Sequence, residues 1–360
     1  MTVLLAIGTR KGLWLGRSED DRRTWSLTGP HFLAQEIAAV AVDTRRTPVR
    51  LLAAVRSEHW GPTVAWSDDL GGSWHETDHG AIRFPADTGA ALARVWQLQP
   101  DTPERPDVVW AGCEPTSVWR STDGGCSFSL VRELWDHPHR PDWAPGAGGA
   151  AVHTVLPDPD SDRVLVAMST GGVYASEDGR SGWTPHNRGI SANFLPDPQP
   201  EFGQCVHKVA ADAAGHGRLY AQNHHGVYRS DDGGGSWISI AAGLPSDFGF
   251  VALASPRTPA TAWVVPMTSD GQRVPPSGRL RVHRTRDGGQ SWNEVGEGLP
   301  DPSWTTVLRD AACVDAGDPT GVYVGTRDGC VYASRDEGGV FRPVAEHLPD
   351  VLCVRAVQLP

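Results

Sequence analysis

The chain has 360 residues, of which 39% are hydrophobic, and this is enough to bury a sizeable core. Its formal net charge of −11, without a basic stripe, excludes a protein that neutralises nucleic-acid phosphates. No apolar run approaches the roughly 20 residues of a membrane-spanning helix. The first residues, MTVLLAIGTRKG, have the pattern of a strand rather than a signal peptide. We therefore expect a cytoplasmic protein with reduced cysteines and with no nucleic-acid or membrane partner.

An eight-residue motif recurs along almost the whole chain. Its pattern is Ser/Thr-x-Asp-x-Gly-x-Ser/Thr-Trp/Phe, and its first glycine is lost or displaced in two weaker copies. In chain order the seven copies begin at Ser18, Ser67, Ser121, Ser176, Ser230, Thr285 and Ser334. Consecutive copies are 49 to 55 residues apart, so the motif indicates a structural repeat rather than seven separate metal or phosphate loops.

Each copy lies between two short strand-like runs and is predicted to be a hairpin turn. The aspartate can accept backbone N–H bonds within the turn, and the glycine supplies a positive φ. The aromatic residue that ends each copy is expected to pack beneath the turn. These residues are Trp25, Trp74, Phe128, Trp183, Trp237, Trp292 and Phe341.

On these seven copies the chain resembles the Asp-box, or bacterial neuraminidase repeat, proteins of the sialidase superfamily. The resemblance implies a β-propeller with the boxes on its blades, away from the ligand site. Seven four-stranded blades fit the length, so we predict an all-β, seven-bladed propeller formed as one domain by residues 1–360. The chain lacks the Arg-Ile-Pro motif of sialidases, and its five tyrosines lie in predicted outer strands. We therefore do not expect classical exo-sialidase activity.

A second repeat, rich in small and apolar residues, is predicted to form the innermost strand of each blade. In chain order its runs are EIAAVAVD from Glu36, LARVWQLQP from Leu92, AAVHTVLPD from Ala150, QCVHKVAAD from Gln204, FGFVALASP from Phe248, VLRDAACVD from Val307 and VLCVRAVQLP from Val351. The last run has no box after it, and the first box has no such run before it. We therefore predict that Val351–Leu359 joins the N-terminal blade and closes the ring.

This strand order sorts the connections onto two faces of the propeller. The boxes share one face with the turns between the first and second strands of each blade. The long connections Arg132–Gly149, Thr184–Gly203 and Met267–Gly278 fall on the other face and carry His, Asp and aromatic residues. Because binding residues concentrate in such loops, we predict that the functional site lies on this second face.

Three residues occupy one shared position in different inner strands. His153, His207 and Asp310 each stand five residues before the aspartate that ends the run, and the two histidines are one repeat apart. We expect these side chains to meet at the axis. Two imidazoles and a carboxylate suit a divalent transition metal or a general acid–base cluster, so we predict them as the metal-binding and catalytic set. The alternative is that the histidines are hydrogen-bonded packing residues and that Asp310 is paired structurally, beside its neighbour Arg309.

Other side chains on the same face are candidates to support this set. Glu114 and His224 are further candidate metal ligands. The predicted ligand-binding residues are Glu114, His224, Arg94, Arg309, His59 and Lys11, whose cations suit a substrate carboxylate or phosphate. Strand alternation predicts that Lys208, next to His207, points away from the axis. No glycine-rich dinucleotide fingerprint follows a strand, so no nucleotide cofactor is expected.

Two classes of function remain open from the sequence. The first is an enzyme, a metal-assisted hydrolase or lyase, acting on a small polar or anionic molecule at the mouth of the central channel. The second is a non-catalytic propeller that binds a ligand or assembles proteins. Fold alone does not separate them, because one fold serves many functions.

Overall fold

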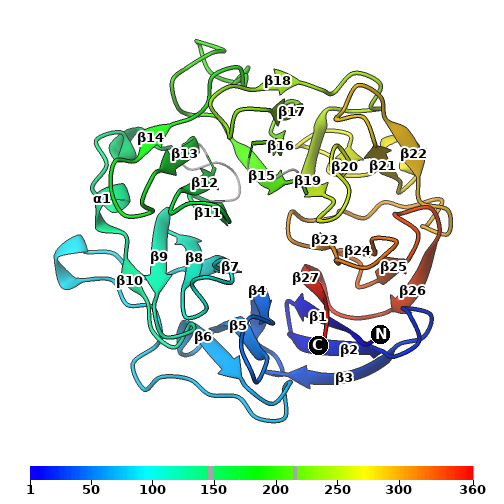
Figure 1. Ribbon diagram of the computed structural model, residues 1–360, viewed down its shortest axis with the longest axis horizontal. Coiled ribbons are helices and arrows are strands. Elements are labelled where there is room, and N and C mark those ends of the chain that lie inside the picture. Colours follow the sequence, from blue (N-terminus) through cyan, green and yellow to red (C-terminus); the bar gives the residue numbers. More distant parts are fainter. Residues whose placement is uncertain (145–148, 170, 214–216, 360) are drawn as a thin grey trace.

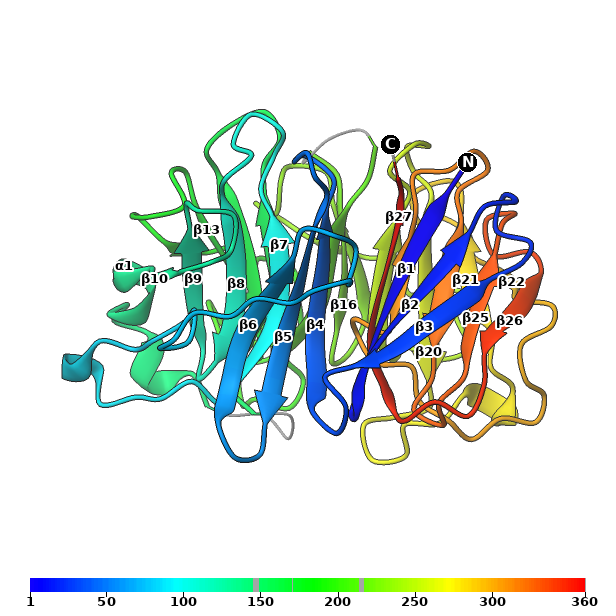
Figure 2. The ribbon, with the colours of Figure 1, turned by 90° about the horizontal axis from the view of Figure 1, so that it is seen from below.

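The computed structural model describes residues 1–144, 149–169, 171–213 and 217–359. Seven antiparallel sheets stand around a common axis (Figure 1). The strands run between the two faces of the ring, and both termini lie at the same face (Figure 2). The prediction of an all-β, seven-bladed propeller is therefore confirmed. Residues 145–148 of the predicted long connection Arg132–Gly149 lie outside the described residues.

The blades follow the chain, and the strands of each blade are named from the axis outward. Blade 1 contains β27 (Val351–Gln358), β1 (Val3–Thr9), β2 (Gly12–Ser18) and β3 (Ser26–His31). Blade 2 contains β4 (Glu36–Asp43), β5 (Arg50–Ser57) and β6 (Gly61–Ser67), with an outer bridge between Trp66 and His75. Blade 3 contains β7 (Arg94–Pro100), β8 (Val109–Glu114), β9 (Ser117–Ser121) and β10 (Ser129–Leu130).

The second half of the ring repeats this arrangement. Blade 4 contains β11 (Val152–Pro157), β12 (Val164–Met168), β13 (Gly172–Ser176) and β14 (Thr184–Pro185). Blade 5 contains β15 (Val206–Ala211), β16 (Leu219–Asn223), β17 (Val227–Ser230) and β18 (Ile238–Ser239). Blade 6 contains β19 (Phe248–Ala254), β20 (Ala262–Met267), β21 (Val282–Thr285) and β22 (Asn293–Val295). Blade 7 contains β23 (Ala312–Val314), β24 (Val322–Gly325), β25 (Val331–Ser334) and β26 (Phe341–Ala345).

Short helices occur only in the connections of the described chain. They are α1 (Arg132–Trp135) and the 3-10 turns Ala86–Thr88, Arg140–Asp142 and Pro276–Gly278. Among the described residues, no helix has both the length and the apolar character needed to cross a membrane.

The C-terminal strand closes the ring as predicted. β27 pairs antiparallel with β1, from Val3 opposite Gln358 to Thr9 opposite Val351. Blade 1 is therefore built from both ends of the chain. This arrangement gives the first and last blades the same four-stranded form as most others and leaves no lone inner edge.

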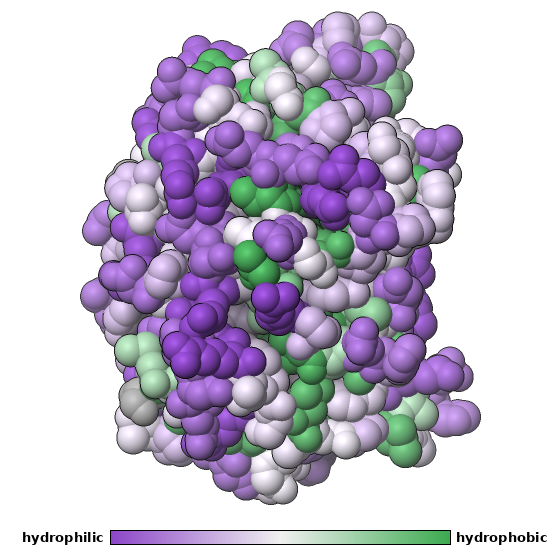
Figure 3. Space-filling model, turned by 90° about the vertical axis from the view of Figure 1, so that its right-hand side faces the viewer, coloured by the Kyte–Doolittle hydropathy of each residue, from purple (hydrophilic) through white to green (hydrophobic). Residues whose placement is uncertain are grey.

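The core fills the spaces between neighbouring blades. One cluster joins β19 and β20 to β23, β24 and β27 and contains the fully buried Trp263 and Tyr323. The outer side of the ring over β22 and β26 is mostly hydrophilic, with small separate hydrophobic groups (Figure 3). Apolar side chains of neighbouring blades therefore pack against one another inside the ring.

The boxes form hairpin turns held by their own aspartates. In blade 5, Oδ1 of Asp232 accepts hydrogen bonds from the Ser230 hydroxyl at 2.7 Å and from the Ser236 backbone N–H at 2.8 Å. Gly234, with a φ of +91°, donates its N–H to the Ser230 hydroxyl at 2.8 Å. The Trp237 indole N–H then reaches the carbonyl of His186 in blade 4 at 2.9 Å. Each box of this kind therefore fixes a turn and joins two blades.

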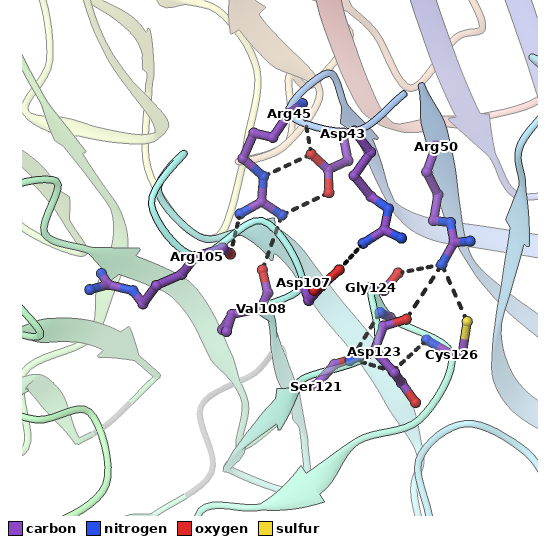
Figure 4. Close-up of polar contacts among 12 residues, drawn as sticks. Asp43, Arg45, Arg50, Arg105, Asp107, Val108, Ser121, Asp123, Gly124 and Cys126 are labelled. Atoms are coloured by element: carbon purple, nitrogen blue, oxygen red, sulfur yellow. Dashed lines mark hydrogen bonds and ion pairs between the residues drawn. The ribbon is translucent and has the colours of Figure 1, made fainter. Parts of the chain in front are cut away.

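Arginines add a second set of contacts between blades on the box face (Figure 4). Arg50 of β5 pairs with Asp68 in its own blade at 2.7 Å and donates to the Gly124 carbonyl of the blade 3 box at 3.2 Å. Arg45 likewise donates to the carbonyl of Val108 at 3.0 Å. Arg163 and Arg229 repeat the contact with the boxes of blades 5 and 6. These four arginines therefore join neighbouring blades on the box face.

Candidate ligand site at the mouth of the central channel

Six of the seven inner strands carry a β-bulge at the same place, close to where the strand begins. A residue skipped by the pairing with the second strand marks each bulge. In blade order these residues are Leu352, Ala38, Trp96, His153, His207 and Phe250, the last together with Val251. A bulge changes the direction of a side chain, and in this ring it collects one residue from each of these blades around the axis.

Four of these residues meet in two pairs of rings, each pair formed across neighbouring blades. The rings of Trp96 and His153 have centroids 5.2 Å apart, and those of His207 and Phe250 are stacked at 5.0 Å. His153 and His207 thus occupy equivalent bulge positions in β11 and β15, and their predicted role stays a prediction. The bulge itself was not predicted.

A pocket of about 170 Å³, the channel-mouth pocket, opens at this ring. Its lining residues come from five blades and are Arg10, Glu36, Ala38, Arg94, Trp96, Phe250, Arg273, Leu308, Arg309, Asp310, Arg327 and Leu352. Five arginines and two carboxylates make the pocket positive, although the chain as a whole carries a charge of −11. The pocket lies on the face predicted to be functional.

Carboxylates hold three of the five arginines at the rim. Glu36, which is buried at the start of β4, pairs with Arg10 at 3.0 Å and with Arg94 at 2.9 Å. Asp350 pairs with Arg10 at 3.3 Å and with Arg327 at 2.8 Å. These pairs position the guanidinium groups around the opening and compensate part of their charge.

Arg309 lies among other cations and aromatic rings. Its guanidinium carbon is 5.0 Å from the ring centre of Trp96 and 5.6 Å from that of Phe250. Arg94 also lies over Trp96, and Arg273 over Phe250. Burial, to which Arg273 and Arg94 add, lowers the pKa of Arg309 to about 10. In the part of the chain that the structure describes, neither Arg309 nor Arg273 has a carboxylate partner.

Asp310 is paired with two cations from other blades. Its Oδ1 accepts from Nζ of Lys208 at 2.9 Å and from the guanidinium of Arg355. Burial acts to raise the pKa of Asp310, but Lys208 and Arg355 outweigh it and lower the pKa to about 2. The expectation that Lys208 points away from the axis was wrong, because the bulge at His207 interrupts the alternation on which it rested.

The two histidines are neutral and hydrogen-bonded. Nε2 of the fully buried His153 lies 2.9 Å from the Ser169 hydroxyl, and Nδ1 of His207 lies 2.6 Å from the carbonyl oxygen of Gly249. Burial, with Arg309 beside them, holds the pKa of both imidazoles well below its usual range. These contacts agree with the alternative that both histidines are hydrogen-bonded packing residues.

The other predicted residues differ in whether they line the channel-mouth pocket. Arg94 and Arg309 line the channel-mouth pocket, as does Asp310. Glu114 accepts a hydrogen bond from the Trp96 indole at 3.0 Å and is not among the lining residues. The exposed His59 and Lys11 also lie outside the lining, and Arg10, next to Lys11, lines the pocket.

The remaining predicted residue, His224, lies near His207. Together with Cys205 these histidines place one ligand atom each within 4.8 Å of one another. This is the one group of three or more metal-ligand side chains that the described residues bring this close. His153 and Asp310 lie outside it, so the predicted metal set stays a prediction that the geometry does not favour.

Sequence reasoning missed Glu36, Trp96, Phe250, Arg273 and Arg327. For three of them, the position in the inner-strand run could have indicated a place in the pocket. Trp96 and Phe250 hold the same place in the inner-strand run as His153, and Glu36 holds the same place as Arg94. An aromatic side chain at such a position is also typical of a packed core, so its residue type does not by itself indicate a binding site.

Several buried polar atoms at the pocket have no hydrogen-bond partner among the described residues. They are Nε of Arg94, Nε of Arg309 and Oδ2 of Asp310. Leaving such atoms unpaired costs free energy. A polar ligand in the pocket would offset that cost.

Comparison with known proteins supports the fold and leaves the activity undefined. No family model matches the chain. The chain is 24% identical over 305 residues to a xyloglucanase of Hypocrea jecorina, and the alignment covers 84% of this chain and 30% of the xyloglucanase. The chain therefore spans less than a third of that relative's length.

Solved structures with the same architecture include an enzyme and a peptide complex. An ancestral GH74 enzyme is 16% identical with a TM-score of 0.57, over 82% of this chain and 36% of that one. YCF48 bound to D1 peptide is 15% identical with a TM-score of 0.53, over 92% and 95% of the two chains. At these identities the likeness shows the propeller fold alone. The resemblance to Asp-box proteins of the sialidase superfamily stays a prediction.

Proposed function

We propose that this protein binds a small anionic molecule, bearing a carboxylate, phosphate or sulfate group, in the channel-mouth pocket. One observation carries the proposal: Arg309 and Arg273 meet at the pocket without carboxylate partners among the described residues. Arginine presents a planar set of donors that matches such anions, and a pocket lined by like charges is relieved by an anion.

The aromatic rings of the pocket support the same conclusion. Trp96 and Phe250 each have an arginine over the ring, so they hold guanidinium groups in place by cation–π contacts. Preorganised donors bind an anion with a smaller entropy cost than mobile ones. A neutral ligand would leave Arg273 and Arg309 without a carboxylate partner among the described residues.

The enzymatic form of the proposal is a hydrolase or lyase that acts on the bound anion. Both lining carboxylates are paired with cations. Burial acts to raise the pKa of Asp310, but Lys208 and Arg355 outweigh it and lower that pKa, which makes Asp310 a poor general acid. Burial, which lowers the pKa of His153 and His207, makes these two imidazoles weak proton acceptors, and neither of them lines the pocket. The geometry supports ligand binding more directly than it supports any one reaction.

A peptide-binding role is the second candidate. The observation in its favour is the likeness to YCF48 bound to D1 peptide, which extends over nearly the whole of both chains. A peptide carboxyl group would offer the pocket the same chemistry as a small carboxylate. Titration with a peptide and with its C-terminal amide separates this role from binding of a small molecule.

Isothermal titration calorimetry with glucuronate, citrate, phosphate and sulfate tests the proposal, with glucose as the uncharged control. We expect at least one anion to bind and glucose not to bind. Arg309→Gln should weaken that binding at least tenfold. Arg257→Gln is the matched control, because Arg257 pairs with Asp318 on the box face and should leave affinity unchanged. Equal binding to the parent and to Arg309→Gln would refute the proposal.

A further inference from the structure

Blade 5 brings a thiol and two imidazoles together beside the channel-mouth pocket. Cys205 lies just before β15, His207 is the bulged residue of β15, and His224 follows β16. The backbone N–H of His224 donates to the carbonyl of Cys205 at 2.9 Å, which fixes the two segments relative to each other. The three ligand atoms lie within 4.8 Å of one another.

The hydrogen bond made by Nδ1 of His207 leaves Nε2, the other ring nitrogen, free to bind a metal ion. Its Nδ1 lies 2.6 Å from the Gly249 carbonyl oxygen, which can only accept a hydrogen bond. Nδ1 therefore carries the proton, and the lone pair of Nε2 stays available. A backbone carbonyl on the second ring nitrogen is a common feature of metal-binding histidines, because it fixes the tautomer and the ring orientation.

In His224, a carboxylate lies near one ring nitrogen, as the Gly249 carbonyl does in His207. Its Nε2 lies 3.7 Å from Oδ2 of Asp270. A carboxylate near one ring nitrogen leaves the other for a metal and makes the imidazole a stronger ligand. Phe194 and Phe248 have ring centroids 5.6 and 5.4 Å from that of His224. Phe248 is buried and Phe194 is exposed, so the imidazole of His224 lies between the core and the surface.

We propose that Cys205, His207 and His224 bind a zinc-class metal ion as three of its four ligands. Thiolate with imidazole is a ligand set that zinc prefers, and three protein ligands leave a fourth position open. Zinc bonds of about 2.0–2.3 Å place ligand atoms roughly 3.3–3.8 Å apart, so binding requires the side chains to close by about 1 Å. The Cys205 thiol releases its proton to solvent as the metal–sulfur bond forms.

This site differs from the metal set expected from the sequence. It keeps His207 and the additional candidate His224, and it uses Cys205 in place of His153 and Asp310. It also does not depend on anion binding in the neighbouring pocket. A metal could therefore be present even if the proposed function fails, and anions could bind without a metal.

Cobalt(II) is a suitable probe, because a thiolate ligand gives it an intense near-ultraviolet charge-transfer band. Protein stripped with a chelator and kept anaerobic is titrated with cobalt(II), and zinc is then added. We expect one cobalt per chain, visible bands of a tetrahedral site, and loss of both signals when zinc displaces cobalt. Absence of the charge-transfer band in the parent protein overturns the proposal without any variant.

Variants assign the ligands. Cys205→Ser should abolish the charge-transfer band, and His224→Gln should weaken cobalt binding at least tenfold. Cys126→Ser is the matched thiol control, because Cys126 lies in the blade 3 box, and His153→Gln is the matched imidazole control. Both controls should titrate like the parent. A band that survives in Cys205→Ser, or disappears only in His153→Gln, would show that the metal binds elsewhere.

Discussion

Asp310 illustrates how a residue suited to catalysis can instead have a structural role. It accepts from Lys208 of blade 5 and Arg355 of blade 1 while itself belonging to blade 7. A single buried carboxylate therefore links three blades through the interior of the ring. Removing one partner of such a group leaves the others as uncompensated buried charges.

Asp310→Asn is expected to destabilise the protein strongly, by about 3–5 kcal/mol, because Lys208 and Arg355 would lose the charge that compensates them. Urea unfolding followed by circular dichroism measures the change. Asp318→Asn is the matched control, since Asp318 is 80% exposed and its surface pair with Arg257 should contribute less than about 1 kcal/mol. If Asp310→Asn unfolds at the urea concentration of the parent, the carboxylate does not hold these cations.

At the scale of the element, the box combines a turn with a contact between blades. Its aspartate organises the hairpin, and its tryptophan donates to the preceding blade, as Trp292 does to the carbonyl of Ile240 at 2.7 Å. Its glycine lies close to that blade as well. A Cβ added to Gly125 would stand 2.8 Å from Leu52 Cδ2, and its φ of +90° favours glycine.

Asp232→Ala should lower the free energy of unfolding by about 1 kcal/mol, since its hydrogen bonds are partly exposed to solvent. Burial acts to raise the pKa of Asp232, but hydrogen bonds led by that from Ser236 lower it to about 2. Its folded pKa lies below the unfolded value of about 3.9, so its contribution is present above that value and lost as the pH falls towards 2.

Urea unfolding at several pH values between 2 and 7 measures this contribution. The variant should lose less stability than the parent between pH 4 and pH 2, and its affinity for the anion at pH 7 should be unchanged. Asp78→Ala, at an exposed carboxylate in the outer loop of blade 2, serves as the control. A variant with parental stability but no ligand binding would contradict the assignment of the boxes to a structural role.

The elements that repeat were the ones that the sequence could predict. Seven boxes and seven inner-strand runs gave the blade count, the strand order and the closing strand, because each inference was supported by several copies. The bulges could not be predicted, since six of the seven inner strands carry one at the same place and the spacing between copies therefore does not reveal it. That is why the position of His207 was anticipated and the orientation of Lys208 was not. Arg273 and Arg327 reach the pocket from turns between strands, whose conformations the pattern of residues does not define.

At the scale of the whole molecule, stability depends on joining the two ends of the chain. β27 contributes a complete inner strand to blade 1, and Val351, Cys353 and Val354 are fully buried. The backbone N–H of Leu359 also donates to the carbonyl of Thr2 at 2.9 Å. The ring is therefore completed only when β27 pairs with β1.

Deletion of residues 351–360 should prevent stable folding, because it exposes the edge of β1 and removes buried residues from two blade contacts. Thermal unfolding and size-exclusion chromatography of the truncated chain test this expectation. A chain that lacks only residues 359–360 is the control. It loses the hydrogen bond to Thr2 but keeps all of β27, so it should still fold and melt cooperatively. A soluble, cooperatively melting truncation at 351 would contradict the role given to β27.

The bulges at the axis also bear on how such a ring can change its preference for a ligand. A bulged residue takes no part in the pairing with the second strand, so another side chain can replace it without altering strand register. The residues found there already include alanine, leucine, two aromatic residues and two histidines. Evolution can therefore vary the lining one residue at a time while the strand pairing within each blade stays the same. Related propellers could in this way come to recognise chemically unrelated molecules through a few independent substitutions.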